Sequence, residues 1–276
     1  MNGPGLRVSI VTPSFNQARF LEETLQSVER QDYPGIEHIV VDGGSTDGSV
    51  DIIRRHGHKL AMWVSEPDNG QADAIRKGFS MATGDVLAWL NSDDMLLPGA
   101  VSVAVRELSR DASRGLVYGD RLEIDANGNT VGKVRLPAHR HSMFRRNFTV
   151  PQETAFFRRA CYDDVGGVDA RLHFAMDFDL WVRLSRVTAM WHVPRFLGCY
   201  RRHDESKSVE AAVSDRGRRY AEEAEAVYRR HFGRALPSPA VMTFYRLVRH
   251  ARVALEQHSP AGRRERAWLR AEPNRE

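Results

Sequence analysis

The sequence has few cysteines, no long apolar run and no leader-like N-terminus. Cys161 and Cys199 are the two cysteines among 276 residues, too few for a disulfide framework and not spaced as a CxxC metal pair. Isolated thiols of this kind predict a protein of a reducing compartment. No stretch approaches the roughly 20 apolar residues of a membrane-spanning helix, and residues 1–7 lack the basic and apolar regions of a signal peptide. We therefore expect a cytoplasmic protein.

Two common nucleotide-binding signatures are also missing. There is no GxGxxG, which disfavours a dinucleotide-binding Rossmann site. Gly43 and Gly48 have the spacing of a P-loop, but Ser49 stands where a lysine is required, which disfavours a P-loop kinase or NTPase. The net charge of +4 is mildly basic and suits anionic ligands or a membrane surface. It gives no reason to expect a nucleic-acid partner.

What is present is a regular alternation of short apolar strands and amphipathic helices. Strands are predicted at 8–11, 38–41, 62–64 and 86–90, each followed by a helical pattern. Such alternation predicts an α/β fold with a mostly parallel, Rossmann-like central sheet flanked by helices. Ligands of these sheets bind beyond the carboxyl ends of the strands.

The second half of the chain follows another pattern. Residues 116–124 and 130–134 are predicted as two strands around the turn at Asn127, and 151–203 mixes short strands with a helix near 177–186. Charged helices are predicted at 216–231 and 241–255, and the last residues are polar. The region after about 207 is therefore expected to be a helical extension with a frayed tail.

Polar clusters follow four of the predicted strands, at 12–17, 42–49, 66–73 and 91–94. In a parallel sheet all four converge on one crevice. The adjacent carboxylates Asp93 and Asp94 repel each other, and Mg²⁺ or Mn²⁺, which prefers oxygen ligands, can offset that repulsion. The alternative for them is a solvated turn before Pro98.

The other clusters leave their roles open on sequence alone. Asp42 can accept hydrogen bonds from a ribose hydroxyl or a base N–H, or it can support a turn together with Asp47. Asp73 and its neighbours can face the crevice or simply cap a helix. His203 lies among Arg201, Arg202 and Lys207, a set that can bind diphosphate oxygens, although a lone histidine is more often a surface or core residue.

Six segments, in the same order along the chain, resemble the family 2 glycosyltransferases. They are VSIVTPSFN at 8–16, VDGGSTDGS at 41–49, WLNSDD at 89–94, QETAFFRR at 152–159, MDFDLW at 176–181 and YRRH at 200–203. The resemblance covers roughly the first three quarters of the chain. It implies a GT-A fold, a nucleotide-diphosphate sugar donor, a divalent cation (Mn²⁺ or Mg²⁺) and transfer to an acceptor hydroxyl with inversion, as in cell-envelope polysaccharide or glycoconjugate synthesis.

The resemblance also implies residue roles. Nucleotide-sugar contacts are expected from Thr12, Pro13, Ser14, Asn16, Asp42, Gly43, Gln71, Asp73, Asn91, Ser92 and Asp93. Metal ligands are expected at Asp93, Asp94 and His203, and acceptor contacts at Gln152, Glu153 and Trp181. Asp177 matches the aspartate that activates the acceptor, and burial beside its aromatic neighbours should raise its pKa. The alternative for Asp177 is complementing the dipole of a helix N-terminus.

Two positions depart from the family pattern. Asn91 stands where many members carry Asp, and Met176 where many carry Glu. They keep open an alternative, a non-catalytic nucleotide-sugar-binding relative. A nucleotidyltransferase is disfavoured because 12–17 contains neither glycine nor a basic residue.

The expected organisation is a GT-A catalytic domain over 1–206, with a nucleotide-binding half at about 1–115 and an acceptor-binding half at about 116–206. The C-terminal extension covers 207–276. Its helices are expected to pack on the domain or on a second subunit, as a homodimer, while the basic helix 241–255 suits a peripheral contact with the inner face of a membrane. The acceptor is left open as a glycan, a lipid-linked glycan or a small molecule.

Overall fold

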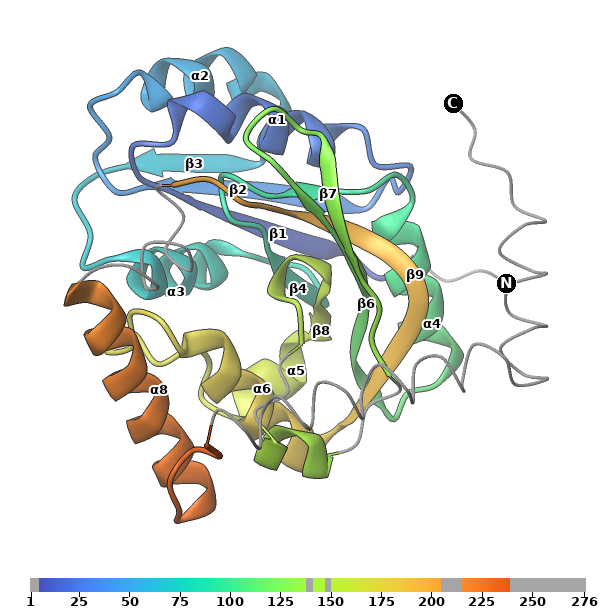
Figure 1. Cartoon of the computed structure of the whole chain (residues 1–276). Coiled ribbons are helices and arrows are strands. Elements are labelled where there is room, and N and C mark those ends of the chain that lie inside the picture. The colour runs from blue at the N-terminus through green and yellow to red at the C-terminus, as the bar shows by residue number, and fades with distance from the viewer. Residues whose placement is uncertain (1–4, 138–140, 147–149, 205–214, 239–276) are drawn as a thin grey trace.

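The computed structural model describes residues 5–137, 141–146, 150–204 and 215–238. Within these residues a nine-stranded sheet curls through the molecule, in the order β3-β2-β1-β4-β8-β6-β9-β5, with β7 paired to β6 (Figure 1). The strands are β1 (Val8–Ser14), β2 (Ile36–Asp42), β3 (Met62–Ser65), β4 (Val86–Trp89), β5 (Met95–Leu96), β6 (Arg114–Ile124), β7 (Thr130–Val134), β8 (Phe156–Arg158) and β9 (Ala189–Arg201). The helices are α1 (Ala18–Glu29), α2 (Ser49–His56), α3 (Gln71–Met81), α4 (Ala100–Arg110), α5 (Arg159–Asp164), α6 (Met176–Val187) and α8 (Asp215–Phe232).

The first half of the chain forms the parallel part of the sheet. Strand β1 lies between β2 and β4, and β3 extends the sheet beyond β2, with all three pairings parallel. Val11 is paired with Ile39 on one side and with Trp89 on the other, so these strands end at the same edge. The expected α/β fold, with a parallel core and flanking helices, is confirmed.

Alternating residues of these strands pack into two hydrophobic layers, one on each face of the sheet. Ile10 faces the layer that contains α4, whereas Val11 faces the layer that contains α3. This follows from the two-residue period of a strand, and it explains why apolar residues of these strands are buried on both faces of the sheet. Gly78 allows α3 to approach β1 closely, because a Cβ there would lie 2.3 Å from a methyl carbon of Val11.

The second half of the chain closes the other side of the sheet. The predicted strands after Arg114 are present as β6 and β7, joined by a turn in which Gly128 has a φ of 83°. Strand β8 links β4 to β6 through antiparallel pairings, and the long strand β9 runs parallel to β6. Strand β9 was expected only as short pieces. It is continuous because β6 and β5 pair with it along its length.

Helix α8 confirms the charged helix predicted at 216–231, and it packs on the same chain. Val227 and Tyr228 are fully buried in the main core cluster, and the ring of Tyr228 stacks on Phe178 of α6 with centroids 6.5 Å apart. In Figure 1, α8 stands beside α6 at the edge of the molecule. The predicted basic helix 241–255 lies outside the described residues. Among the residues that are described, no helix has the length and apolar character needed to cross a bilayer.

Candidate functional site

The strand ends open into a cavity of about 670 Å³. Its walls come from the residues that follow β1, β2 and β4, from the segments that begin α3 and α6, and from α8. The lining residues are Pro13, Ser14, Phe15, Gln17, Gly43, Pro67, Asp68, Gly70, Gln71, Ala74, Trp89, Asn91, Ser92, Asp93, Gln152, His173, Phe174, Met176, Asp177, Tyr200 and Tyr220. A cavity of this size, lined by several aromatic rings together with polar and charged side chains, has the character of a small-molecule site.

The turn after β4 contributes three of the predicted donor contacts, Asn91, Ser92 and Asp93. Gln71, at the start of α3, donates a 2.6 Å hydrogen bond from Nε2 to Asn91 Oδ1. Both residues were predicted to contact the nucleotide sugar, and they lie 20 residues apart in the chain. One hydrogen bond joins them. An amide at position 91 suits this bond, since Oδ1 accepts from Gln71 while Nδ2 donates to Asp94.

Asp93 and His203 come together although they are 110 residues apart in the chain. His203 Nε2 lies 3.0 Å from Asp93 Oδ2, and Asp93 also lines the cavity. The imidazole is almost fully buried and packs against Phe20, with ring centroids 4.5 Å apart. A carboxylate oxygen and an imidazole nitrogen thus lie side by side at the cavity wall.

Asp94 does not join that pair. Its side chain is buried, it accepts a 3.0 Å hydrogen bond from the backbone N–H of Arg201, and it is absent from the cavity lining. Burial, followed by the charge of Asp93, raises the pKa of Asp94 well above its usual range. The adjacent carboxylates therefore point apart, because successive residues in the turn face different sides. Asp93 reaches the cavity, whereas Asp94 connects the turn to β9 through its hydrogen bond with Arg201.

Asp42 holds the turn after β2. Its carboxylate is fully buried and accepts from the backbone N–H groups of Gly44 and Ser45, and from the hydroxyls of Ser45 and Ser65. This is the turn-supporting role that the sequence left open. It presents Gly43 to the cavity, where an added Cβ would lie 2.8 Å from a carboxylate oxygen of Asp68.

Three more predicted donor contacts, Thr12, Asn16 and Asp73, are not among the residues that line the cavity. Thr12 bonds the ring of His38 at 2.9 Å, and Asp73 accepts from the backbone N–H of Asn69 at 3.1 Å. Asn16 adopts a φ of 51° and accepts from the backbone N–H of Thr46 at 2.9 Å. Their neighbours Pro13, Ser14 and Gln71 reach the cavity instead, so these three residues shape the loops that line it.

Asp177 lies in the first turn of α6 and lines the cavity. Its side chain is half-buried, and Oδ1 accepts a 2.7 Å hydrogen bond from the backbone N–H of Phe178. Burial raises the pKa of Asp177 to about 6, and the hydrogen bond only partly opposes that shift. A carboxylate with this pKa is a better proton acceptor near neutral pH than an ordinary aspartate.

The predicted acceptor contacts are divided between the cavity and the core. Gln152 lines the cavity, and its side-chain amide donates to the backbone carbonyl of Trp89. Glu153 is buried, lies 3.8 Å from Arg121, and has its pKa raised by burial. Trp181 is fully buried and stacks on Trp89, with centroids 5.3 Å apart. Trp89 rather than Trp181 faces the cavity, so Trp181 supports the wall from behind.

Apart from Trp181, sequence reasoning assigned no ligand contact to an aromatic side chain. Phe15 lines the cavity and is 59% exposed, and Phe174, Tyr200 and Tyr220 also line it. An exposed phenylalanine inside a polar strand-end motif was a signal that could have been used, because large apolar side chains on a surface often mark binding sites. Tyr220 lies in a charged helix and carried no such signal.

A divalent cation fits part of this site. Within the described residues, no group of three or more histidine, cysteine, aspartate or glutamate side chains is arranged to hold a metal ion. Asp93 and His203 supply one oxygen and one nitrogen donor at 3.0 Å from each other. Mg²⁺ and similar ions are commonly held by one or two protein groups together with substrate phosphates. The pair therefore suits a cation whose remaining ligands come from a bound diphosphate.

Known proteins resemble this chain in sequence. The family model described as Glycosyl transferase family 2 matches residues 9–165, which is more than half of the chain. An uncharacterized glycosyltransferase of Mycobacterium tuberculosis is 35% identical over 187 residues, covering 65% of this chain and 69% of the relative. A chondroitin synthase of Escherichia coli is 26% identical over 208 residues, covering 74% of this chain but 30% of that longer protein.

Solved structures share the fold at low sequence identity. The S. aureus protein TarS (residues 1–349), in complex with UDP-GlcNAc, matches with a TM-score of 0.67 and 18% identity, covering 86% of this chain and 69% of that one. The mannosyltransferase PcManGT from Pyrobaculum calidifontis, in complex with GDP-Man and Mn²⁺, matches with a TM-score of 0.64 and 20% identity, covering 98% and 77%. These likenesses confirm the GT-A fold, and the family match confirms the resemblance read from the six motifs. The chain belongs to glycosyl transferase family 2.

Proposed function

We propose that this glycosyltransferase takes its sugar from a nucleotide-diphosphate sugar and transfers it, with inversion, to an acceptor hydroxyl. The observation that carries the proposal is that Asp93, paired with His203, and Asp177, whose pKa burial raises to about 6, line one and the same cavity. An inverting transfer needs a group that stabilises the leaving diphosphate and a base for the incoming hydroxyl. The two carboxylates are suited to these two tasks.

The donor would lie along the strand ends. Asn91, Ser92, Asp93 and Gly43 offer hydrogen-bonding groups and close backbone approach, and Phe15 offers a ring against which a nucleobase can stack. Two structural relatives are named as complexes with UDP-GlcNAc and with GDP-Man and Mn²⁺, which supports a nucleotide-sugar donor. A divalent cation held by Asp93 and His203 would supply positive charge to the leaving diphosphate.

Asp177 would act as the general base. The acceptor oxygen forms a bond to the anomeric carbon while the bond from that carbon to the diphosphate oxygen breaks, and the hydroxyl proton passes to the Asp177 carboxylate. Attack from the face opposite the leaving group inverts the anomeric configuration. A positioned base typically contributes about 10² to 10⁴ in rate.

The acceptor would be a carbohydrate or a glycoconjugate of the cell envelope. Two observations support this class: aromatic rings line the cavity, and the relatives include a chondroitin synthase of Escherichia coli and a glycosyltransferase of PGL/p-HBAD biosynthesis in Mycobacterium bovis.

A thermal-shift screen with UDP, GDP and dTDP, in Mn²⁺, Mg²⁺ or EDTA, tests the donor half of the proposal. A ligand that binds only the folded state raises the unfolding midpoint by mass action. We expect one nucleotide to raise Tm, and EDTA to abolish that rise. Absence of a shift with all three nucleotides would contradict the proposal. A shift without any release of nucleoside diphosphate from the matching nucleotide sugar would favour the non-catalytic relative.

A further inference from the structure

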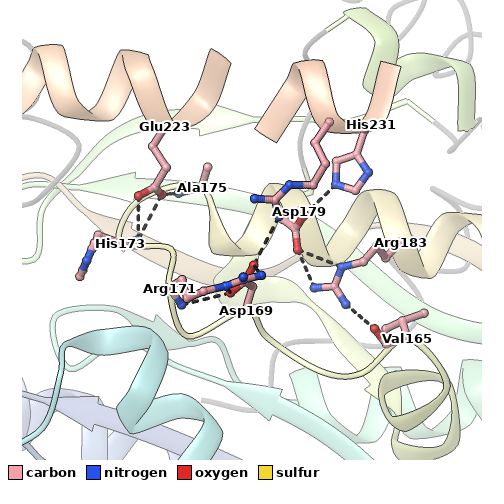
Figure 2. Close-up of polar contacts among 10 residues, drawn as sticks. Val165, Asp169, Arg171, His173, Ala175, Asp179, Arg183, Glu223 and His231 are labelled. Carbon is pink, nitrogen blue, oxygen red and sulfur yellow. Dashed lines mark hydrogen bonds and ion pairs between the residues drawn. The ribbon is translucent and has the colours of Figure 1, made fainter. Parts of the chain in front are cut away.

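The loop before α6 is held by a glutamate from a distant helix. Glu223 of α8 accepts hydrogen bonds from three consecutive backbone N–H groups, those of His173, Phe174 and Ala175. Figure 2 shows Glu223 with His173 and Ala175. Its Oε1 lies 2.7 Å from the nitrogens of Phe174 and Ala175, and its Oε2 lies 2.9 Å from that of His173. Charge-assisted bonds of this kind are roughly twice as strong as neutral ones.

The position of this contact makes it a cap for α6. Ala175 is the N-cap residue of α6, and its side chain cannot accept a hydrogen bond. Glu223 instead accepts from the backbone N–H of Ala175 itself, one of the amides at the helix start that have no partner within the helix. Its negative charge also complements the positive N-terminal end of the helix dipole. Asp177, the proposed base, follows two residues after the capped position. The contact therefore fixes both the loop and the start of the helix that carries Asp177.

Helix α8 has two further polar anchors that do not involve residues 173–175. His231 Nε2 lies 2.8 Å from Asp179 Oδ1, and Arg230 lies 3.3 Å from Asp169 (Figure 2). Glu223, the buried Val227 and His231 are spaced four residues apart, so they share one face of the helix. Val227 and His231 therefore fix the face of α8 that carries Glu223, and so fix the position from which Glu223 contacts residues 173–175.

The same helix adds a side chain to the cavity wall. Tyr220 lies one turn before Glu223 and meets Phe174 edge to face, with ring centroids 5.8 Å apart. Both rings line the cavity, as does His173. Tyr220 is nevertheless 43% exposed, so part of its surface is available to a ligand. The aromatic pair is brought together by the loop that Glu223 holds.

We propose that Glu223 is a positioning residue for the acceptor. By fixing residues 173–175, it places the Phe174–Tyr220 pair beside Asp177. There the two rings contact a ring-shaped acceptor, a pyranose sugar. This rests on the proposed transferase function. Such rings offer a flat apolar surface to the C–H groups of a pyranose and leave its hydroxyls free for reaction. Residues 215–238 of α8 and its end lie outside the 9–165 segment that matches the family, so this part of the wall belongs to the chain's own C-terminal region.

The test compares three variants of the full chain. Glu223→Gln keeps the size of the side chain but removes its charge and one of its two acceptor oxygens. Glu222→Gln makes the same change at a neighbouring side chain that is 69% exposed and faces Arg218 at 3.9 Å. His231→Gln loosens α8 at Asp179 without touching the loop. The last two variants separate loss of the loop contact from loss of surface charge and from weaker docking of α8.

Two readouts are taken for each variant. Hydrogen exchange follows the amides of residues 173–175. Steady-state kinetics follow nucleoside diphosphate release from UDP-GlcNAc or GDP-mannose, with water or with p-nitrophenyl pyranosides as acceptors. For Glu223→Gln we expect exchange at these amides to accelerate about tenfold and KM for the pyranoside to rise about tenfold, as loss of charge-assisted hydrogen bonds predicts. Release to water should fall by a smaller factor than transfer to the pyranoside, because water makes no contact with the Phe174–Tyr220 pair.

The proposal is overturned if Glu223→Gln matches Glu222→Gln in both readouts. It is equally overturned if His231→Gln raises the pyranoside KM as much as Glu223→Gln does, because the effect would then reflect docking of α8 alone. Absence of nucleoside diphosphate release by the unmodified protein with any donor would contradict the proposed function instead. The exchange rates would still decide whether Glu223 holds the loop.

Discussion

His203 Nε2 lies 3.0 Å from Asp93 Oδ2, which joins the segment after β9 to the turn after β4 at the wall of the cavity. If this pair holds a cation beside the donor diphosphate, Asp93→Asn should remove the Mn²⁺-dependent part of the nucleotide thermal shift. Turnover should fall by about 10²-fold or more, as for the loss of a group that stabilises developing charge. The exposed neighbour Asp204→Asn is the control and should behave as the unmodified protein. An Asp93→Asn protein with an undiminished Mn²⁺ effect would rule the pair out as the cation site.

Asp94 should behave as a structural residue. Burial raises the pKa of its carboxyl, which accepts from the backbone N–H of Arg201. Asp94→Asn removes the charge that burial disfavours and keeps an acceptor oxygen. We expect less than about a fivefold change in turnover from that change, and a loss of about 1–3 kcal/mol of unfolding free energy from Asp94→Ala, which leaves a buried donor unpaired. Urea unfolding and initial rates measure the two effects. Loss of cation dependence in Asp94→Asn would show instead that Asp94 is a ligand.

Asp177 gives the pH dependence of the reaction. Its pKa is raised to about 6 by burial, and the base must be ionised, so kcat/KM should rise with pH and level off above about pH 6. The raised pKa also has a consequence for stability. Ionisation of Asp177 is less favourable in the folded state than in the unfolded state. Its contribution to the free energy of unfolding therefore falls as pH rises from about 4, the ordinary pKa of an aspartate, through about 6.

Asp177→Asn should therefore abolish most turnover without lowering Tm above pH 6. Asn can still accept the backbone N–H of Phe178, and the cost of a buried charge disappears. The difference in Tm between Asp177→Asn and the unmodified protein should shift in favour of the variant as pH rises from 4 to 7. Asp179→Asn, two residues further along the same helix, removes a carboxylate that pairs with His231 and Arg183. Because the pKa of Asp179 is lowered, this variant should lose Tm relative to the unmodified protein from pH 4 to 7, and the loss should shrink only as pH falls below about 4. If Asp177→Asn kept full turnover, Asp177 would not be the general base.

Much of the site could be read from the sequence because its motifs are local. The turn at 91–94 and the first turn of α6 lie where a polar segment follows an apolar strand or precedes a helix, and the parallel sheet brings them to one edge. The side on which each carboxylate points could not be read. Asp93 faces the cavity and Asp94 faces Arg201, because the backbone path of the turn is set by contact with β9. The contribution of Tyr220 and Glu223 depends on long-range docking of α8, which leaves no local pattern.

Trp181 illustrates the same distinction between motif and placement. It belongs to a motif of the family, yet it is fully buried behind Trp89. Trp181→Ala should cost about 3–5 kcal/mol of unfolding free energy, as for other large core truncations. Trp181→Phe should retain the KM for pyranoside acceptors within about threefold, because Trp181 does not line the cavity and an aromatic ring is kept behind Trp89. A selective rise in acceptor KM with unchanged Tm in Trp181→Phe would place the indole in the acceptor site after all.

The most direct test of the central claim is the stereochemistry of transfer. The protein is incubated with Mn²⁺, an α-linked donor (UDP-GlcNAc, UDP-glucose or GDP-mannose) and p-nitrophenyl pyranosides, and the new glycosidic bond is examined by NMR. An inverting transfer that uses Asp177 as base predicts a β-linked product in equal amount to the nucleoside diphosphate released beyond the release to water, and little of either product with Asp177→Asn. An α-linked product, or equal product from Asp177→Asn, would contradict the account.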